Sequence, residues 1–143
     1  MESRPNGRFM MYTPATGQTT VLLKNLYFAN GVALSQNEDF VLINETYRYR
    51  VVRYWLTGVN KGKKDIFIEN LPGFPDNISS NRKGKFWIAL FTVRNPMMDQ
   101  LHPFPFLKEQ LSKLPKAFWP KPKPYGLVIA LDEQGNITQS LHD

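Results

Sequence analysis

Three side chains with oxygen donors stand at related places in this sequence. Asn30 follows Phe28 by two positions, and Asp76 follows Phe74 by two positions, 46 residues later, with Asn77 directly after it. One carboxylate and two amide oxygens are hard ligands of the kind that Ca²⁺ takes, whereas Zn²⁺ is usually held by nitrogen and sulfur. The alternative is that all three are ordinary turn residues. The sequence predicts a calcium site at Asn30, Asp76 and Asn77 only if the fold brings them together.

Other site chemistry has little support in the residue types present. The chain has no Cys, which excludes thiolate catalysis, Cys-ligated zinc and disulfides together. It contains no Gly-x-Ser-x-Gly motif and no phosphate-binding loop. The two histidines, His102 and His142, are 40 positions apart and form no metal motif, so we interpret both as structural or surface residues. Catalytic residues therefore stay unassigned.

An internal repeat supplies the elements that would position the three oxygen donors. Phe28–Val32 is matched 46 residues later by Phe74–Ile78, and Phe40–Leu42 by Phe86–Ile88 at the same offset. Thr46 and Thr92 also match at this offset, as do Arg48 and Arg94. Matches at a fixed interval of this size indicate a repeat architecture.

Each repeat unit has the pattern of four short β-strands. In the first unit the expected strands are 32–35, 40–45, 49–56 and 66–68, and in the second they are 77–80, 86–91, 127–131 and 137–141. Two more strands are expected before them, at 8–12 and 19–23. Four-stranded units of this length are typical of β-propeller blades, the alternative being a β-sandwich. First strands of a propeller line its central channel, so Asn30 and Asp76 would converge on the axis.

The fold class that follows is all-β, a partial β-propeller with a short helical insertion. We expect a half blade over 1–26, a blade over 27–72 and a blade over 73–143 that carries an insertion at 95–124. Within the insertion, apolar residues at helical spacing follow Pro105, and Pro115 would end the helix. This helix could cover the sheet, act as a lid, or contact a membrane surface through neighbouring aromatic residues.

Charge and hydropathy limit the classes of partner that we expect for this chain. The chain has 18 Lys and Arg against 12 Asp and Glu, a formal net charge of +6. Five lysines lie together between 108 and 123, and no basic stripe alternates with aromatic residues, so we expect no nucleic-acid partner. No run of 18 apolar residues and no apolar leader at 1–8 is present, so membrane association is not encoded in this segment. A small-molecule substrate is the expected partner.

Several segments together resemble one family. The run 70–78, Asn-Leu-Pro-Gly-Phe-Pro-Asp-Asn-Ile, is the most specific of them. The other matching segments are 22–45, 53–56, 86–89, 101–103, 125–128 and 140–143. The chain resembles the strictosidine-synthase-like proteins, the group that includes the adipocyte plasma-membrane-associated proteins. Nearly the whole chain takes part in the resemblance, which implies a propeller of six blades. The ten expected strands would make about two and a half of them.

The resemblance also implies an activity for the complete protein. The family is similar to calcium-dependent six-bladed hydrolases such as paraoxonases and gluconolactonases, in which an Asn of Asn-Gly and an Asp of Pro-Asp hold the metal. Carried over, these are Asn30 and Asp76, with Asn77 where the pattern is Asp-Asn. Their calcium polarises an ester, lactone or phosphoryl oxygen. The expected function is an arylesterase-like esterase or lactonase, with Ca²⁺ as the cofactor of the full-length protein.

Two alternatives stay open at this point. A condensing enzyme of the strictosidine-synthase type would use a glutamate from a later part of the family's sequence, outside this chain. A propeller scaffold would use no metal at all and bind a partner. A further Glu and Asn ligand are expected from earlier blades, so we expect this segment by itself to be inactive.

Overall fold

The computed structural model describes residues 4–94 and 126–142, and these residues form three antiparallel sheets. An N-terminal hairpin consists of β1 (Gly7–Thr13) and β2 (Gln18–Leu26). The first sheet follows, with β3 (Ala29–Leu34), β4 (Phe40–Glu45), a 3₁₀ turn η1 (Thr46–Arg48), β5 (Arg50–Trp55) and β6 (Lys64–Ile68). The second sheet has β7 (Gly73–Ser80), β8 (Lys85–Val93), β9 (Leu127–Asp132) and β10 (Ile137–His142).

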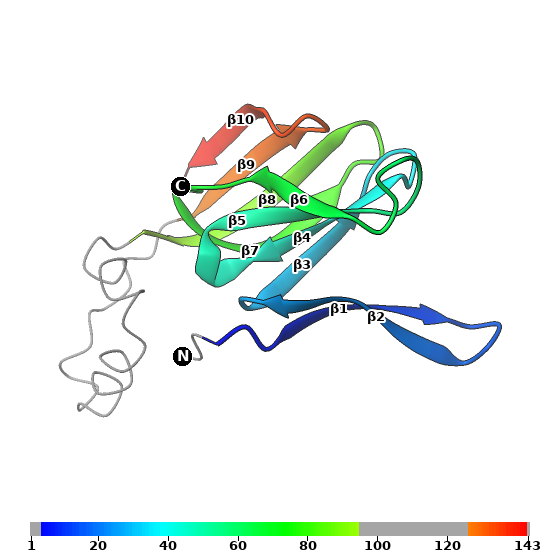
Figure 1. Ribbon diagram of the computed structural model, residues 1–143. Coiled ribbons are helices and arrows are strands. Elements are labelled where there is room, and N and C mark those ends of the chain that lie inside the picture. The colour runs from blue at the N-terminus through cyan, green and yellow to red at the C-terminus, as the bar shows by residue number, and fades with distance from the viewer. Residues whose placement is uncertain (1–3, 95–125, 143) are drawn as a thin grey trace.

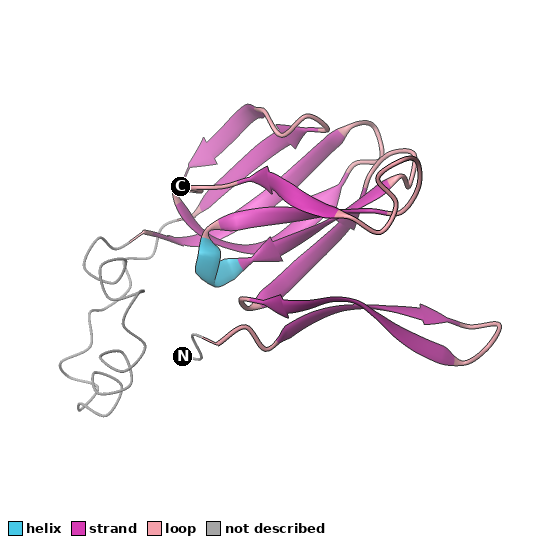
Figure 2. Ribbon diagram, viewed as in Figure 1, coloured by secondary structure: helices cyan, strands magenta, loops and turns pink. Residues whose placement is uncertain are grey.

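Both larger sheets have four strands in the order of the chain, so every hydrogen-bonded neighbour is also a neighbour in sequence. Figure 1 shows the two sheets stacked face to face, with the hairpin extending along one side. Strands account for nearly all the described secondary structure, and η1 is the one helical turn among residues 4–94 and 126–142 (Figure 2). The predicted all-β class is confirmed. The helix expected after Pro105 lies outside the described residues.

The local sequence explains why these segments are strands. β4 reads Phe-Val-Leu-Ile-Asn-Glu and is buried at all six positions, as expected for a strand covered on both faces. β5 reads Arg-Val-Val-Arg-Tyr-Trp, a β-branched and aromatic run. Gly84 and Gly135 occupy the β7–β8 and β9–β10 turns with φ of 78° and 89°, which favours glycine there.

Two apolar clusters hold the sheets together. The larger cluster lies between the first and second sheets and contains buried residues of both. Phe40, Phe67 and Phe86 meet there, with ring centroids 6.0 to 6.1 Å apart. The smaller cluster joins the other face of the first sheet to the hairpin through Leu26, Val41, Ile43 and Tyr54.

Phe40 and Phe86 match at the 46-residue offset in sequence, but they do not occupy equivalent places in the two sheets. The turn after β3 is closed by a hydrogen bond from Ser35 N to Phe40 O, and the turn after β7 by one from Asn81 N to Lys85 O. The first turn is therefore one residue longer, and a shift of one residue moves side chains to the opposite face of a strand. Phe40 and Phe86 accordingly face each other across the interface and do not repeat the same position.

Candidate cation site and the clefts beside it

The first strand of each four-stranded sheet, β3 or β7, is its inner strand. These two inner strands approach each other at Gly31. A Cβ atom at Gly31 would lie 2.6 Å from Ile78 N and 2.8 Å from Asp76 O, both main-chain atoms. Only glycine has room for so close an approach. The Asn-Gly sequence thus allows β3 to pass directly over the Pro75–Ile78 stretch of β7 and places Asn30 next to Asp76.

The structure brings two of the three expected ligands into contact. Asn30 Nδ2 donates a hydrogen bond to Asp76 Oδ1, across the 46 residues that separate them in sequence. The Asn30 side chain is exposed and Asp76 is half-buried. A carboxylate and an amide therefore meet at the start of two neighbouring inner strands, in reach of solvent.

Asn77 lies elsewhere. It is exposed and lines a cleft of about 180 Å³ together with Ile78, Ser79, Trp87, Ala89 and Val128. The ladder between β7 and β8 has a register irregularity between Pro75 and Ile78. Side chains need not alternate between the two faces of the strand at such a place, so alternation does not fix where Asn77 points. Among the described residues, the Asn77 side chain makes no hydrogen bond to Asn30 or to the Asp76 carboxylate.

Two fully buried polar residues fix the main chain at Asp76. Asn44 Nδ2 donates a hydrogen bond of 2.9 Å to Asp76 O, and Thr46 Oγ1 donates one of 2.7 Å to Pro75 O. Asn44 is 0% and Thr46 1% exposed. Among the described residues, Asn44 Oδ1 has no hydrogen-bond partner. The sequence did not predict a role for either residue, although polar residues that end an apolar run are a signal for such a role.

Glu45 anchors the turn that follows β4. It is fully buried, accepts a 2.7 Å hydrogen bond from Tyr27 N, and pairs at 2.5 Å with the Nε of Arg50. A buried carboxylate is tolerated because both of its oxygens have partners. The pair holds the chain just before β3 against the end of β4. Asn30 lies at this same end of the sheet.

A row of aromatic rings begins at residues close in sequence to the Asn30–Asp76 contact. Phe28 contacts Tyr47, Tyr47 contacts Phe74, and Phe74 stacks on Phe91, with centroid distances of 5.0, 6.4 and 5.4 Å. Phe28 and Phe74 each precede an expected ligand by two residues. The ends of the row, Phe28 and Phe91, are 51% and 52% exposed. Exposed aromatic surface is therefore available at both ends of the row.

Other candidate chemistry is sparse in the part of the chain that the structure describes. Residues 4–94 and 126–142 contain no group of three or more His, Cys, Asp or Glu side chains that could hold a metal. His142 Nε2 lies 3.3 Å from Ser140 Oγ on an exposed strand, and His102 falls outside the described residues. Within the described ranges, no helix has the length and apolar character needed to cross a membrane.

Comparison with known sequences gives a consistent result. Residues 1–59 match the family described as strictosidine synthase. The whole chain aligns at 42% identity with the adipocyte plasma membrane-associated protein of Bos taurus, of which it covers 36%. It aligns at 34% identity with strictosidine synthase-like protein 13 of Arabidopsis thaliana and again covers 36% of it. The chain thus spans about a third of the length of these relatives.

Comparison with solved structures identifies the fold. A luciferin-regenerating enzyme superposes with a TM-score of 0.64 at 14% identity, over 96% of this chain and 36% of that one. Regucalcin from Agrobacterium tumefaciens, described as a calcium-binding protein, superposes with a TM-score of 0.61 at 17% identity, over 96% of this chain and 37% of that one. Both neighbours are propeller-type proteins, so the three sheets are a partial β-propeller.

Proposed function

Because this chain belongs to the strictosidine synthase-like family of β-propeller proteins, we propose that the complete protein is a calcium-dependent hydrolase. Its substrates would be small organic esters or lactones. Asn30 and Asp76 would contribute to the calcium site. The observation that supports this most directly is the Asn30–Asp76 contact, because it joins two oxygen-bearing side chains that are far apart in sequence.

The donor set fits a calcium ion better than a softer metal. Asp76 offers a carboxylate and Asn30 an amide, and Ca²⁺ takes oxygen ligands of both kinds. Two side chains fall short of the six to eight oxygens that Ca²⁺ takes, so other parts of the protein and water would supply the rest. A ligand role for Asn77 stays a prediction, because its side chain faces a different cleft.

The residues of this chain have distinct roles in the proposal. A bound calcium ion would supply Lewis acidity toward a carbonyl or phosphoryl oxygen. Asp76 supplies the negative charge, and Asn30 orients one of its oxygens by hydrogen bonding. Asn44 and Thr46 hold the main chain beneath Asp76. The aromatic row gives a surface against which the organic part of a substrate can lie, and it favours aryl or otherwise apolar esters.

The experiment is calcium titration of the complete protein by calorimetry, with hydrolysis of phenyl acetate and of a γ-lactone followed in parallel. Asp76→Ala should weaken calcium binding by at least about tenfold, since the number of charged ligands sets the affinity of a calcium site. Asn30→Ala should weaken it less, because it removes a neutral ligand. Glu69→Gln is the matched control, since Glu69 is an exposed carboxylate away from the site.

Unchanged calcium affinity and unchanged turnover in Asp76→Ala would reject the proposal. Asp76 would then be a residue that only shapes the start of β7. Calcium binding that depends on Asp76 without any ester or lactone hydrolysis would retain the site and reject the hydrolase activity.

A further inference from the structure

Two guanidinium groups stack on tyrosine rings close to the aromatic row. Arg48 Cζ lies 4.0 Å from the centre of the Tyr27 ring, and Arg94 Cζ lies 4.4 Å from the centre of the Tyr49 ring. Tyr49 in turn contacts Phe74, a member of the row, with ring centroids 4.6 Å apart. Stacking of this kind occupies the face of a guanidinium and holds its N–H edge in a fixed direction. A fixed N–H edge is the arrangement that binds a carboxylate with two parallel hydrogen bonds.

Main-chain hydrogen bonds bring both arginines to the segments that lead into β3 and β7. The first N–H of η1, the turn that ends at Arg48, donates a 3.2 Å hydrogen bond to Phe28 O, and Tyr27 directly precedes Phe28. Arg94 N donates a 3.1 Å hydrogen bond to Pro72 O. Phe28 and Pro72 stand two and four positions before the proposed calcium ligands of β3 and β7. Both arginines therefore belong to the end of the sheets at which that calcium site lies.

Two aromatic residues at this end of the sheets have left-handed backbones. The φ angle is 55° at Phe28 and 50° at Tyr49. Such angles are rare for bulky side chains, because the Cβ atom crowds the main chain. Phe28 is also 51% exposed, so neither its backbone nor its burial favours a phenylalanine there. Residues with this kind of strain gather at binding sites, where contact with a ligand accounts for them.

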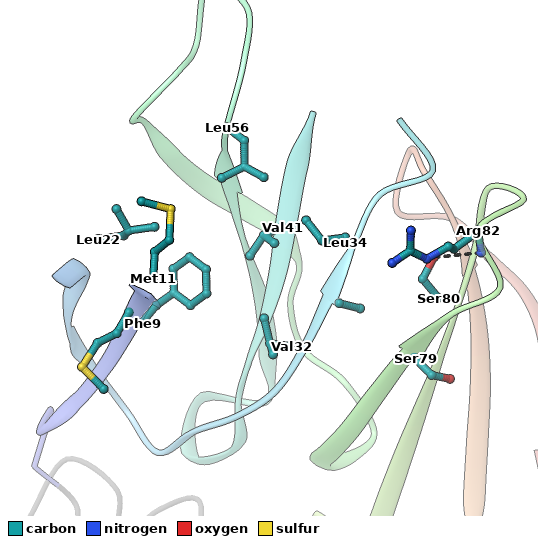
Figure 3. Close-up of a pocket in the computed structure, with 12 residues that line it drawn as sticks. Phe9, Met11, Leu22, Val32, Leu34, Val41, Leu56, Ser79, Ser80 and Arg82 are labelled. Atoms are coloured by element: carbon teal, nitrogen blue, oxygen red, sulfur yellow. Dashed lines mark hydrogen bonds between the residues drawn. The ribbon is translucent and has the colours of Figure 1, made fainter. Parts of the chain in front are cut away.

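Arg82, at the opposite end of β7, differs from these two arginines. It borders an apolar cleft of about 530 Å³ that lies between the N-terminal hairpin and the first sheet (Figure 3). Its guanidinium pairs with Glu38 at 3.3 Å. Arg48 is exposed, and no carboxylate among the described residues lies within ion-pair distance of it. The charge of Arg48 can therefore act on a ligand, whereas that of Arg82 has a partner within the protein.

We propose that the aromatic row and these two arginines form a subsite for an aromatic carboxylate. The rings would hold the aromatic group by stacking, and a guanidinium would hold the carboxylate by charge-assisted hydrogen bonds. That the ligand is part of a substrate rests on the proposed function, whereas its binding requires no hydrolysis. The complete protein would accordingly favour aryl esters that carry a carboxylate over neutral aryl esters.

The first test compares two esters in the complete protein, para-acetoxybenzoate as the anionic one and phenyl acetate as the neutral one. Arg48→Gln and Arg94→Gln should each lower the ratio of kcat/KM for the anionic ester to that for the neutral ester by at least about fivefold, because each removes a charged donor. A general loss of the reaction would affect both esters alike. Arg82→Gln is the matched control and should leave the ratio unchanged, because Arg82 follows the far end of β7.

The second test measures binding of para-hydroxybenzoate to the complete protein by calorimetry, which requires no hydrolysis. Each of the two variants, Arg48→Gln and Arg94→Gln, should weaken binding by at least about fivefold, and sodium chloride should weaken binding to the wild type. An effect of one arginine alone would support the subsite and show which guanidinium binds the carboxylate. Arg94→Lys, which keeps the charge and loses the planar fork, replaces Arg94→Gln if that variant does not fold.

Phe28→Gly separates binding from folding. Glycine adopts a φ of 55° without strain, so this variant should bind para-hydroxybenzoate more weakly and should not have a lower melting temperature. A lower melting temperature with unchanged binding would show that the Phe28 ring only supports the fold, and would overturn the aromatic part of the subsite.

The two proposals fail in different ways. Binding of para-hydroxybenzoate that depends on the arginines, without hydrolysis of either ester, would reject the proposed function and retain the subsite. If neither arginine variant changes the binding or the ester ratio more than Arg82→Gln does, the subsite is overturned, whether or not the protein hydrolyses esters.

Discussion

Asp65 illustrates how single side chains stabilise this fold. Its carboxylate accepts two hydrogen bonds of 2.9 Å from Arg53, which lies opposite it in the β5–β6 ladder, and one of 3.1 Å from Trp55. The Arg53 guanidinium also lies 4.4 Å from the centre of the Trp55 ring. A planar guanidinium suits this bidentate and stacked geometry, which a lysine could not reproduce.

The contacts of Asp65 predict a pH dependence of stability. Burial acts to raise the pKa of Asp65, but the hydrogen bonds from Arg53 and Trp55 and the charge of Arg53 outweigh it, so that the pKa lies below its ordinary 3.8. A carboxyl whose pKa is lowered by folding adds stability above its unfolded pKa, and this stability is lost as the pH falls through the folded pKa.

Urea unfolding between pH 6 and pH 3 measures the effect. Asp65→Asn should be less stable than wild type at pH 6, and the difference should shrink toward pH 3. The side chain of Asp65 is 43% exposed, so solvent screening keeps the effect modest. A constant difference over the whole range would show that the charge of Asp65 is not responsible.

At the scale of elements, the contact between β3 and β7 leaves very little space for side chains. Gly31 has no room for a side chain because main-chain atoms of β7 surround its Cα. Asn44 and Thr46 then fix the same stretch of β7 from the side of β4. Three strands thus share one junction, and Asp76 is part of it.

Gly31→Ala should destabilise the protein by about 2–3 kcal/mol, since two main chains must separate to admit the methyl group. Gly17→Ala is the control for glycine loss in general: Gly17 has a φ of 65° and nothing within 4 Å of a Cβ position. It should cost about 1 kcal/mol, from backbone strain alone. Equal losses of unfolding free energy in the two variants, measured in urea, would contradict the tight junction.

The elements also show what the sequence could predict and what it could not. The strands were predictable because β-branched and aromatic runs alternate with turn residues. The 46-residue match found both inner strands, but β3 and β7 begin three and four residues earlier than expected. The face of each strand was not predictable, because one extra residue in the 35–40 turn reverses the side chains of β4. The direction of Asn77 was not predictable for another reason: the register irregularity between Pro75 and Ile78 in the β7–β8 ladder cannot be read from the sequence.

At the scale of the whole molecule, large apolar side chains are exposed at two places among the described residues. On the hairpin side, Met10, Met11, Tyr12 and Val32 are exposed, and in the second sheet Phe91, Ile137 and Leu141 are 52% to 58% exposed. A propeller as long as the relatives that this chain matches would have further blades at both places.

The 143-residue chain should therefore associate with itself. Contiguous exposed apolar surface and open strand edges favour association in water. Sedimentation velocity from 1 to 100 μM should show the mean sedimentation coefficient rising with concentration, and less steeply in Phe91→Lys. A compact monomer over the whole range would contradict this expectation.

The spacing between strands has a consequence for the order of assembly. Residues 46–49 join β4 to β5, but residues 94–126 join β8 to β9, a connection about eight times longer. Closing the longer connection costs about 2 kcal/mol more in chain entropy. During synthesis from the N-terminus, the first sheet can close once Ile68 has left the ribosome, and β7 and β8 can dock on it early. β9 and β10 are then the last strands to join, on a nucleus that already exists.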